Sequence, residues 1–220
     1  MYRGLRVERG YDSLTTDMQT KSDTITGWRA ALYNRLMGIF GARRVYEKAL
    51  ELIARGKGER FLDVGCGTGT FLRMASERFP NARLTGVDAS EDMLTQARKA
   101  LQGLPVELIY ADAAILPFPN ESFAFVVSVL TFHHLPQSIK IRAIQEIARV
   151  LKKGGKCLIV DFGRAETAWG SLNLFFLNWH SHTRGNMTLV EQELARWGLR
   201  QERQKWHRGF VEFLLARMRT

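Results

Sequence analysis

The sequence predicts an α/β fold, a doubly wound parallel sheet with helices on both faces, and three observations support this. Short apolar segments alternate with amphipathic segments of helical length between residues 59 and 161. A glycine-rich turn connects the first apolar segment to the first helical one. The apolar segments are continuous, as in strands that are buried on both faces. Together these features indicate a parallel sheet inside two layers of helices.

Each element has its own signal in the sequence. We expect strands near 59–64, 83–87, 106–110, 123–130, 156–161, 199–206 and 209–218, and helices near 70–79, 90–102, 138–152 and 188–197. Ser90 and Ser138 are suited to cap the amino ends of two of these helices. Gly154 and Gly155 are suited to end the helix that precedes the fifth strand. A chain of 220 residues with 45% hydrophobic residues is enough for one domain with a full core.

The turn at residues 61–69 is the strongest functional signal in the chain. Its sequence, Phe-Leu-Asp-Val-Gly-Cys-Gly-Thr-Gly, joins an apolar run that ends in an acid to three alternating glycines. Glycine is needed where a backbone turns sharply or approaches a ligand closely. The helix that begins at Thr70 offers free N–H groups at its amino end. These features predict a site for a nucleotide-like cofactor.

The spacing of the glycines narrows the choice of cofactor. A dinucleotide fingerprint has the pattern G-x-G-x-x-G, whereas the third glycine comes one residue earlier here. Asp88 follows the next strand, where a carboxylate can accept hydrogen bonds from both hydroxyls of a ribose. No Lys-Ser or Lys-Thr pair follows the glycines, which excludes a phosphate-binding P-loop. A tight connection without a ligand is the alternative, and the second acid argues against it.

Several segments together resemble the class I S-adenosylmethionine-dependent methyltransferases. They are Asp-Val-Gly-Cys-Gly-Thr-Gly at 63–69, Gly-Val-Asp-Ala-Ser at 86–90, Tyr-Ala-Asp-Ala at 110–113, the strand 123–128 followed by Thr-Phe-His-His-Leu at 131–135, and the turn 149–156. In that last turn Lys153 stands where the family usually has proline. The resemblance covers residues 45–165 and is greatest to the UbiE-type quinone methyltransferases (methyltransferase type 11) and their relatives that methylate lipids and small molecules. It implies a seven-stranded Rossmann-like sheet, completed by a C-terminal antiparallel hairpin.

The resemblance also implies S-adenosyl-L-methionine as the cofactor. The implied site consists of Asp63, Gly65, Cys66, Gly67, Gly69, Asp88, Ala89, Met93, Asp112, Ala113 and Ser128. The glycines would meet the methionine part of the cofactor, whose amino end Asp63 would hold. Asp88 would bind the ribose hydroxyls. Ala89 and Met93 would flank the adenine, with Asp112 on its exocyclic amine.

Catalysis makes few demands on such a protein. Methyl transfer from a sulfonium is an in-line displacement, so the protein mainly orients the acceptor and excludes water, with Ser128 implied near the sulfonium. A general base is needed only if the acceptor enters protonated, and His133 and His134 are the candidates. The alternative for both is a place in the wall of the acceptor pocket. Asp161, at the end of the fifth strand, is a further candidate whose alternative role is a structural hydrogen bond.

The acceptor must be inferred from segments outside the cofactor site. Residues 27–44 carry Trp28, Leu32, Leu36 and other apolar residues on one helical face and arginines elsewhere. Such a helix can lie in a membrane interface, or it can be a lid that packs its apolar stripe on the core. We therefore expect an N-terminal arm and helix over residues 1–44, followed by the methyltransferase domain over 45–220. An aromatic cluster at 168–180 is a candidate lining for the acceptor pocket, with ordinary core as the alternative.

The net charge of +10 points to an anionic partner. Basic residues are frequent in segments 27–48 and 196–220. Gathered on one side of the fold they would favour an anionic lipid surface, and scattered they would form a solvated surface. The two cysteines have no metal-ligand spacing and make no disulfide framework, so we expect no metal site and a reducing, cytoplasmic setting.

The sequence thus predicts a cytoplasmic methyltransferase that acts on a small or lipid-like acceptor, either a quinone precursor or a phospholipid amine, with attachment to the inner face of a membrane. Methylation of a soluble small molecule is the alternative. A nucleic-acid methyltransferase is disfavoured because the chain has no motif for a flipped base and no appended RNA-binding module. A protein that binds the cofactor without turnover is the remaining rival. We find no sequence feature that indicates an oligomeric state.

Overall fold

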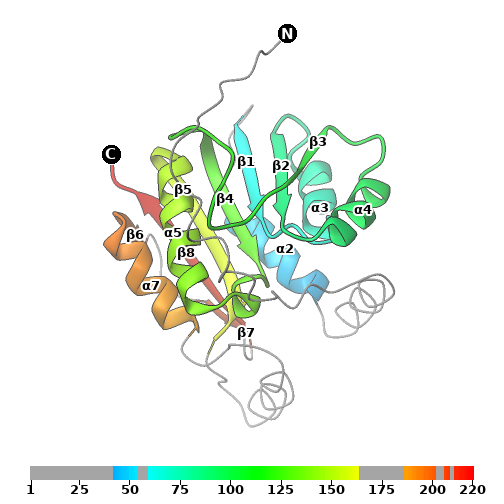
Figure 1. Ribbon diagram of the computed structural model, residues 1–220. Helices are drawn as coiled ribbons and strands as arrows, with labels where there is room; N and C mark the ends of the chain where they lie inside the picture. Colours follow the sequence, from blue (N-terminus) through cyan, green and yellow to red (C-terminus); the bar gives the residue numbers. More distant parts are fainter. Residues whose placement is uncertain (1–41, 54–58, 164–185, 202–205, 209–210) are drawn as a thin grey trace, which may run out of the picture.

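One mixed β-sheet with helices on both faces forms the described part of the protein in a computed structural model (Figure 1). The structure describes residues 42–53, 59–163, 186–201, 206–208 and 211–220. Within these ranges the strands are β1 Arg60–Val64, β2 Arg83–Asp88, β3 Val106–Tyr110, β4 Phe123–Val129, β5 Leu151–Phe162, β6 Leu199–Gln201, β7 Trp206–Arg208 and β8 Val211–Met218. Their order is β3-β2-β1-β4-β5-β8-β6, and β7 also pairs with β8.

The pairing confirms the expected fold class. Strands β1 to β5 pair in parallel, and β8 is antiparallel to β5. The expected C-terminal hairpin is present, but its first strand is in two pieces, β6 and β7, that pair with the two ends of β8. Gln201 and Trp206 are five positions apart in the sequence, whereas their partners Ala216 and Phe213 are three positions apart, so the register shifts by two residues between the pieces. Seven strands lie on the main path of the sheet, as the resemblance implied.

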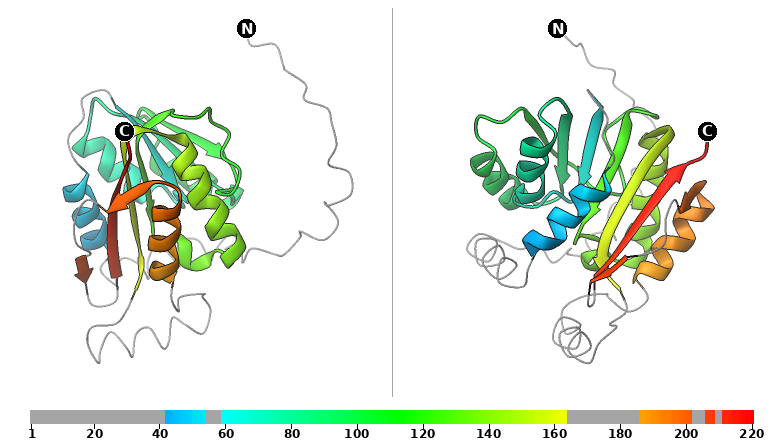
Figure 2. Two further views of the ribbon diagram at one scale, coloured as in Figure 1. Left: turned by 90° about the vertical axis from the view of Figure 1, so that its left-hand side faces the viewer. Right: turned by 180° about the vertical axis from the view of Figure 1, so that it is seen from behind.

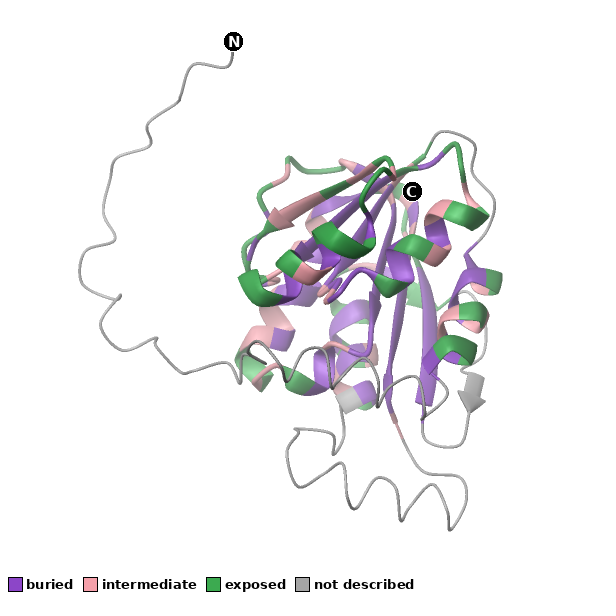
Figure 3. Cartoon of the chain, turned by 90° about the vertical axis from the view of Figure 1, so that its right-hand side faces the viewer, coloured by how far each residue is buried: buried purple, intermediate pink, exposed green. Residues whose placement is uncertain are grey.

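The helices form two layers, visible on opposite sides of the sheet in Figure 2. They are α2 Ala42–Leu52, α3 Thr70–Arg78, α4 Glu91–Ala100, α5 Gln137–Val150 and α7 Asn186–Arg196, with a short 3-10 helix, η1, at Phe132–His134. One core cluster joins α2, α3 and α4 to the sheet, for example through Phe71 and Leu94. A second cluster joins α5 and α7 to the other face, for example through Ile144 and Val190. Figure 3 shows the buried strands between helices whose outer sides are exposed.

Helix ends follow the expectations at one place and depart from them at two. Ser90 caps α4, because its hydroxyl accepts a hydrogen bond from the Met93 backbone N–H at 3.3 Å. The prediction for Ser138 is wrong, since α5 begins at Gln137 and Pro136 precedes it. Gly154 does not end α5 either. The helix ends at Val150 and the chain passes directly into β5, which holds Gly154 at a φ of 72°.

The amino-terminal expectations are tested in part. Helix α2 was not predicted, and it crosses the expected domain boundary at residue 44. Residues 27–41 of the expected amphipathic helix and the aromatic cluster at 168–180 lie outside the described residues. Among the helices that the structure does describe, none is long and apolar enough to cross a bilayer.

Candidate cofactor and acceptor site

The glycine-rich turn follows β1 at the carboxyl edge of the parallel strands, where ligands bind in folds of this type. The Gly65 and Cys66 backbone N–H groups both donate to the Val87 carbonyl, at 2.8 and 2.9 Å, and this ties the turn to the end of β2. Gly65 has a φ of 75°, and a Cβ there would overlap the Thr131 side chain. The sequence needs glycine at this position for both reasons, the backbone conformation and the close neighbour.

Asp88 holds the turn from the neighbouring strand. One carboxylate oxygen accepts a hydrogen bond from the Gly67 N–H at 2.8 Å, and the other accepts from the Ser90 N–H at 2.9 Å. Burial raises the pKa of Asp88, and these two backbone donors partly oppose that rise. The expected ribose acid therefore lies against the glycine turn, and each of its oxygens keeps acceptor capacity for a ligand.

Asp63 is the most deeply buried acid of the cofactor site. The residue is 2% exposed, and its carboxyl group accepts no hydrogen bond from the described residues. Complete burial, followed by the charge of Asp88, raises its pKa to about 8. A buried carboxylate without a donor is costly unless a cation meets it. Asp63 is therefore suited to receive a positively charged group from a ligand.

Tyr46 is a neighbour of this acid that the sequence analysis missed. It comes from α2, and burial together with the charge of Asp63 raises the pKa of its phenol to about 12. Its ring packs edge-on against Phe71 of α3, with the ring centroids 6.0 Å apart. No motif marked Tyr46, because its position follows only from the packing of α2 on α3.

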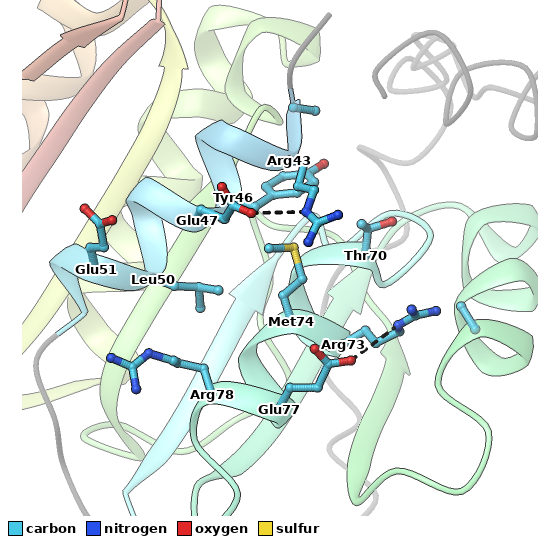
Figure 4. A pocket seen from close by; sticks show the side chains of 12 residues that line it. Arg43, Tyr46, Glu47, Leu50, Glu51, Thr70, Arg73, Met74, Glu77 and Arg78 are labelled. Atoms are coloured by element: carbon cyan, nitrogen blue, oxygen red, sulfur yellow. Dashed lines mark hydrogen bonds and ion pairs between the residues drawn. The ribbon is translucent and has the colours of Figure 1, made fainter. Parts of the chain in front are cut away.

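Tyr46 also lines a groove of about 780 Å³ between α2 and α3, shown in Figure 4. The groove has apolar side chains such as Leu50 and Met74, and charged pairs such as Arg43–Glu47 at 3.1 Å. Thr70, the first residue of α3, contributes to the lining. The groove thus begins next to the glycine turn and runs along the outside of α3.

The expected adenine side lies between the ends of β2 and β3. Asp88 is in register with Tyr110, and the Ala111 N–H donates to the Asp88 carbonyl at 3.1 Å. Asp112 is exposed, and one of its carboxylate oxygens accepts from the Ala114 N–H at 2.8 Å. Of the other expected residues, Ala89 is exposed, Ala113 half-buried and Met93 buried.

Two of the expected cofactor residues face the protein itself. Ser128 is 1% exposed, and its hydroxyl donates to the Val64 carbonyl at 2.8 Å, which links β4 to β1. Cys66 is buried with its Sγ 2.9 Å from the place that a Cβ would take on Gly86. Burial, followed by the charges of Asp63 and Asp88, raises the pKa of the Cys66 thiol well above its usual value.

The structure separates the two histidines that follow β4. His133 is 4% exposed, its backbone N–H donates to Asp161 at 3.0 Å, and its Nδ1 lies 2.8 Å from the other carboxylate oxygen of Asp161. His134 is exposed, with its ring centroid 3.9 Å from that of His133. Burial works to raise the pKa of Asp161, but the charge and hydrogen bonds of His133, helped by the Phe162 N–H, hold it below its usual value.

Two further charged residues accompany this pair, and sequence reasoning missed both. Lys140, in the first turn of α5, is 3% exposed, and burial lowers its pKa while Asp161 opposes the change. Glu212 of β8 is 5% exposed and stands in register with Asp161. Within the described ranges, no three His, Cys, Asp or Glu side chains are grouped so as to hold a metal ion.

Comparison with known proteins agrees with this geometry. A family model described as a methyltransferase domain matches residues 61–155. The chain is 35% identical over 136 residues to a demethylmenaquinone methyltransferase of Thermus thermophilus, covering 61% of each protein. It is 33% identical over 159 residues to a phosphatidylethanolamine N-methyltransferase of Cereibacter sphaeroides, covering 70% of this chain and 66% of that protein. The chain thus spans about half to two thirds of the length of the curated relatives it matches.

A solved structure shows the same fold. The crystal structure of an S-adenosylmethionine-dependent methyltransferase from Aquifex aeolicus has a TM-score of 0.64 to this chain at 23% identity, covering 79% of this chain and 89% of that one. The likeness therefore extends over most of both chains and is one of fold.

Proposed function

Because the chain belongs to the S-adenosylmethionine-dependent methyltransferases, we propose that it transfers a methyl group to a small or lipid-like acceptor at a membrane. The acceptor is either a quinone precursor or a phospholipid amine. The names of two relatives, a demethylmenaquinone methyltransferase and a phosphatidylethanolamine N-methyltransferase, support these two classes. The cofactor is S-adenosyl-L-methionine, which supplies an activated methyl group on its sulfonium.

The observation that carries the proposal is the buried carboxyl group of Asp63. S-adenosyl-L-methionine brings two cations, an ammonium and a sulfonium, and Asp63 lacks a positive or donor partner among the described residues. A cation beside Asp63 would restore the carboxylate and remove the cost of burying it. We assign Asp63 to the ammonium end of the cofactor, with Gly65, Gly67 and Gly69 beneath its methionine part.

The remaining cofactor roles follow from the places of the side chains. Asp88 binds the ribose hydroxyls with the acceptor capacity that remains on its two oxygens. Asp112, exposed after β3, meets the adenine amine. Ser128 supports the site from within, since its hydroxyl bonds to the Val64 carbonyl.

For the acceptor side we propose different roles for the two histidines. His134 is exposed, so it is the one that can take a proton from an acceptor that enters protonated. Partial desolvation of its ring, followed by the charge of His133, lowers the pKa of His134 to about 4, so the imidazole is neutral at pH 7 but is a weak base there. His133 and Asp161 are buried and bonded to each other, so they position the η1 turn that carries His134. The reaction itself needs orientation and exclusion of water more than acid–base help.

The first test is transfer of a tritiated methyl group from S-adenosyl-L-methionine to a total lipid extract, followed by phase partition and chromatography. We expect label in the organic phase, with the mobility of either a methylated quinone or a methylated phospholipid. Binding of the cofactor is measured separately by calorimetry. Label confined to the aqueous phase would contradict the lipid acceptor, and absence of cofactor binding would contradict the function as a whole.

A further inference from the structure

One corner of the molecule collects basic side chains from three strands and a helix end. It is formed by the start of β5, the end of β8, β6 and the end of α7, which lie together near the C-terminus in Figure 2. We call it the basic corner, and it comprises Lys152, Lys153, Lys156, Arg196, Trp197, Arg200, Arg217 and Arg219. Of these eight residues, only Lys156 is half-buried and the others are exposed.

Two short distances show that the segments carrying these residues are neighbours. The Arg219 N–H donates to the Gly198 carbonyl at 3.2 Å, which joins the end of β8 to the turn after α7. A Cβ on Gly154 would lie 3.7 Å from the Thr220 side chain, which joins the start of β5 to the same place. These contacts place the start of β5, the end of β8 and the turn after α7 next to one another.

Three of the basic residues form a row across the strands. Lys156 of β5 is opposite Arg217 of β8, and Arg217 is opposite Arg200 of β6. Directly paired residues of antiparallel strands project from the same face of the sheet, so the three side chains share one face. The row therefore adds three basic side chains to the corner on this face of the sheet.

The acidic residues of these strands lie at the other end. Among the described residues of β5, β6 and β8, the acids are Asp161 and Glu212, both buried at the carboxyl edge. Arg196 has an acidic neighbour, Glu193, at 3.6 Å. Glu191 of the same helix lines a hollow together with Arg200 and Arg219. The seven basic residues of the corner outnumber these two acids, and their spread over several elements suits an extended anionic surface better than a single small anion.

Trp197 adds an apolar anchor to the charge. It is one of three large hydrophobic side chains that are exposed in the described part of the chain. It stands between Arg196 and Arg200 in the sequence. Tryptophan is enriched at the headgroup level of membranes, where its apolar ring and polar N–H both find partners. Exposed tryptophan among arginines is the composition of a surface that lies in an anionic lipid interface.

We propose that the basic corner docks this protein on an anionic lipid surface. The choice of a lipid surface rests on the proposed function, in which the acceptor is lipid-like. Lys156 is five residues along β5 from Asp161, roughly 17 Å at the rise of a strand. The corner therefore lies at the opposite end of β5 from the acceptor site, and a membrane bound there leaves the carboxyl edge of the sheet uncovered.

Flotation with vesicles tests this. The vesicles are phosphatidylcholine with and without phosphatidylglycerol, in about 0.1 M and about 1 M salt. The corner variant carries Lys153→Gln, Arg200→Gln and Arg219→Gln. A control variant of equal charge change carries Arg44→Gln, Arg83→Gln and Lys99→Gln, all exposed and outside the corner.

We expect the wild type to bind only the anionic vesicles, and less at high salt. Each neutralised residue lowers the partition coefficient about fivefold, so the corner variant loses roughly a hundredfold, whereas the control variant stays within about tenfold. Trp197→Ala is expected to weaken the binding that persists at high salt. Equal losses in both triple variants, or equal binding to both kinds of vesicle, would overturn the proposal.

RNA binding and cofactor binding are measured as well, to distinguish a nucleic-acid surface from a lipid surface and to test the proposed function separately. Binding of a labelled single-stranded RNA that depends on the corner, without vesicle binding, would replace the lipid by a nucleic acid and overturn the proposal. Calorimetry with S-adenosyl-L-methionine is expected to give the same affinity for the corner variant and the wild type. If the wild type binds the vesicles but not the cofactor, the docking surface is supported and the proposed methyltransferase function is contradicted.

Discussion

Replacement of Asp63 by asparagine should change how the stability of the cofactor-free protein depends on pH. The pKa of Asp63 rises from 3.8 to about 8 in the folded protein. Between about pH 4 and about pH 8 the folded state thus keeps a proton that the unfolded state has released. Since the folded state binds more protons, the free energy of unfolding falls as the pH rises through this window. At about 1.4 kcal/mol per pKa unit, the shift of Asp63 lowers the free energy of unfolding across this window by roughly 6 kcal/mol at most.

The assay is urea unfolding at a series of pH values from about 4 to about 8 without cofactor. The asparagine side chain has nearly the same shape as the protonated acid and does not titrate, so Asp63→Asn should flatten the pH dependence and gain stability on the wild type towards pH 8. Asp88 remains in both proteins, so the pH dependence of stability that Asp88 itself causes is present in both curves. Parallel curves for wild type and variant would show that Asp63 is not held protonated, and the reasoning from burial would then be wrong.

Three other predictions follow from the same site. Asp88→Ala should lower cofactor affinity in calorimetry by roughly 1–3 kcal/mol, because it removes acceptors for the ribose and for two backbone N–H groups; unchanged affinity with an intact fold would contradict its assignment. Gly65→Ala should unfold at lower urea and bind the cofactor weakly, because its Cβ would overlap the Thr131 side chain. Adding Thr131→Ser should restore part of the lost stability, because it removes the methyl group that the new Cβ would overlap. If it restores none, the loss of stability comes from the backbone φ of 75° alone. His134→Ala should slow methyl transfer chiefly above about pH 4 and below the acceptor's own pKa, where the ring is neutral and the acceptor still carries the proton that it removes. Asp161→Asn should slow transfer at all pH values, because it disturbs the position of the turn; equal pH profiles for the two variants would contradict their separate roles.

The parts of the proposed cofactor site that the sequence marked are local. The three glycines and Thr70 lie within a few residues of each other, so the turn and the start of α3 follow from their spacing. Asp88 was found because it ends a strand whose neighbour is adjacent in the chain. Ser90 was recognised as a cap because the donor it meets, Met93, is three residues away.

Predictions failed where a local signal competed with tertiary contacts. Ser138 looks like a cap, but α5 starts one residue earlier, at Gln137. Gly154 looks like a helix end, but β5 begins at Leu151, in register with Phe123 of β4. The pairing with a strand far away in the sequence sets the start of β5, and a local pattern carries no information about that partner.

The sequence by itself determined the fold class, the glycine-rich turn and the family resemblance, because each depends on residues that are close along the chain. Only the tertiary structure decided which charges are buried and which gather. Asp63 in β1 becomes a high-pKa acid because its neighbours exclude water, and its charge raises the pKa of Tyr46 on α2. His133 and His134 are adjacent in sequence, yet one is sealed against Asp161 and the other is exposed. The basic corner unites residues that are up to 67 positions apart, from Lys152 to Arg219, because strand pairing, and not sequence distance, sets what lies side by side.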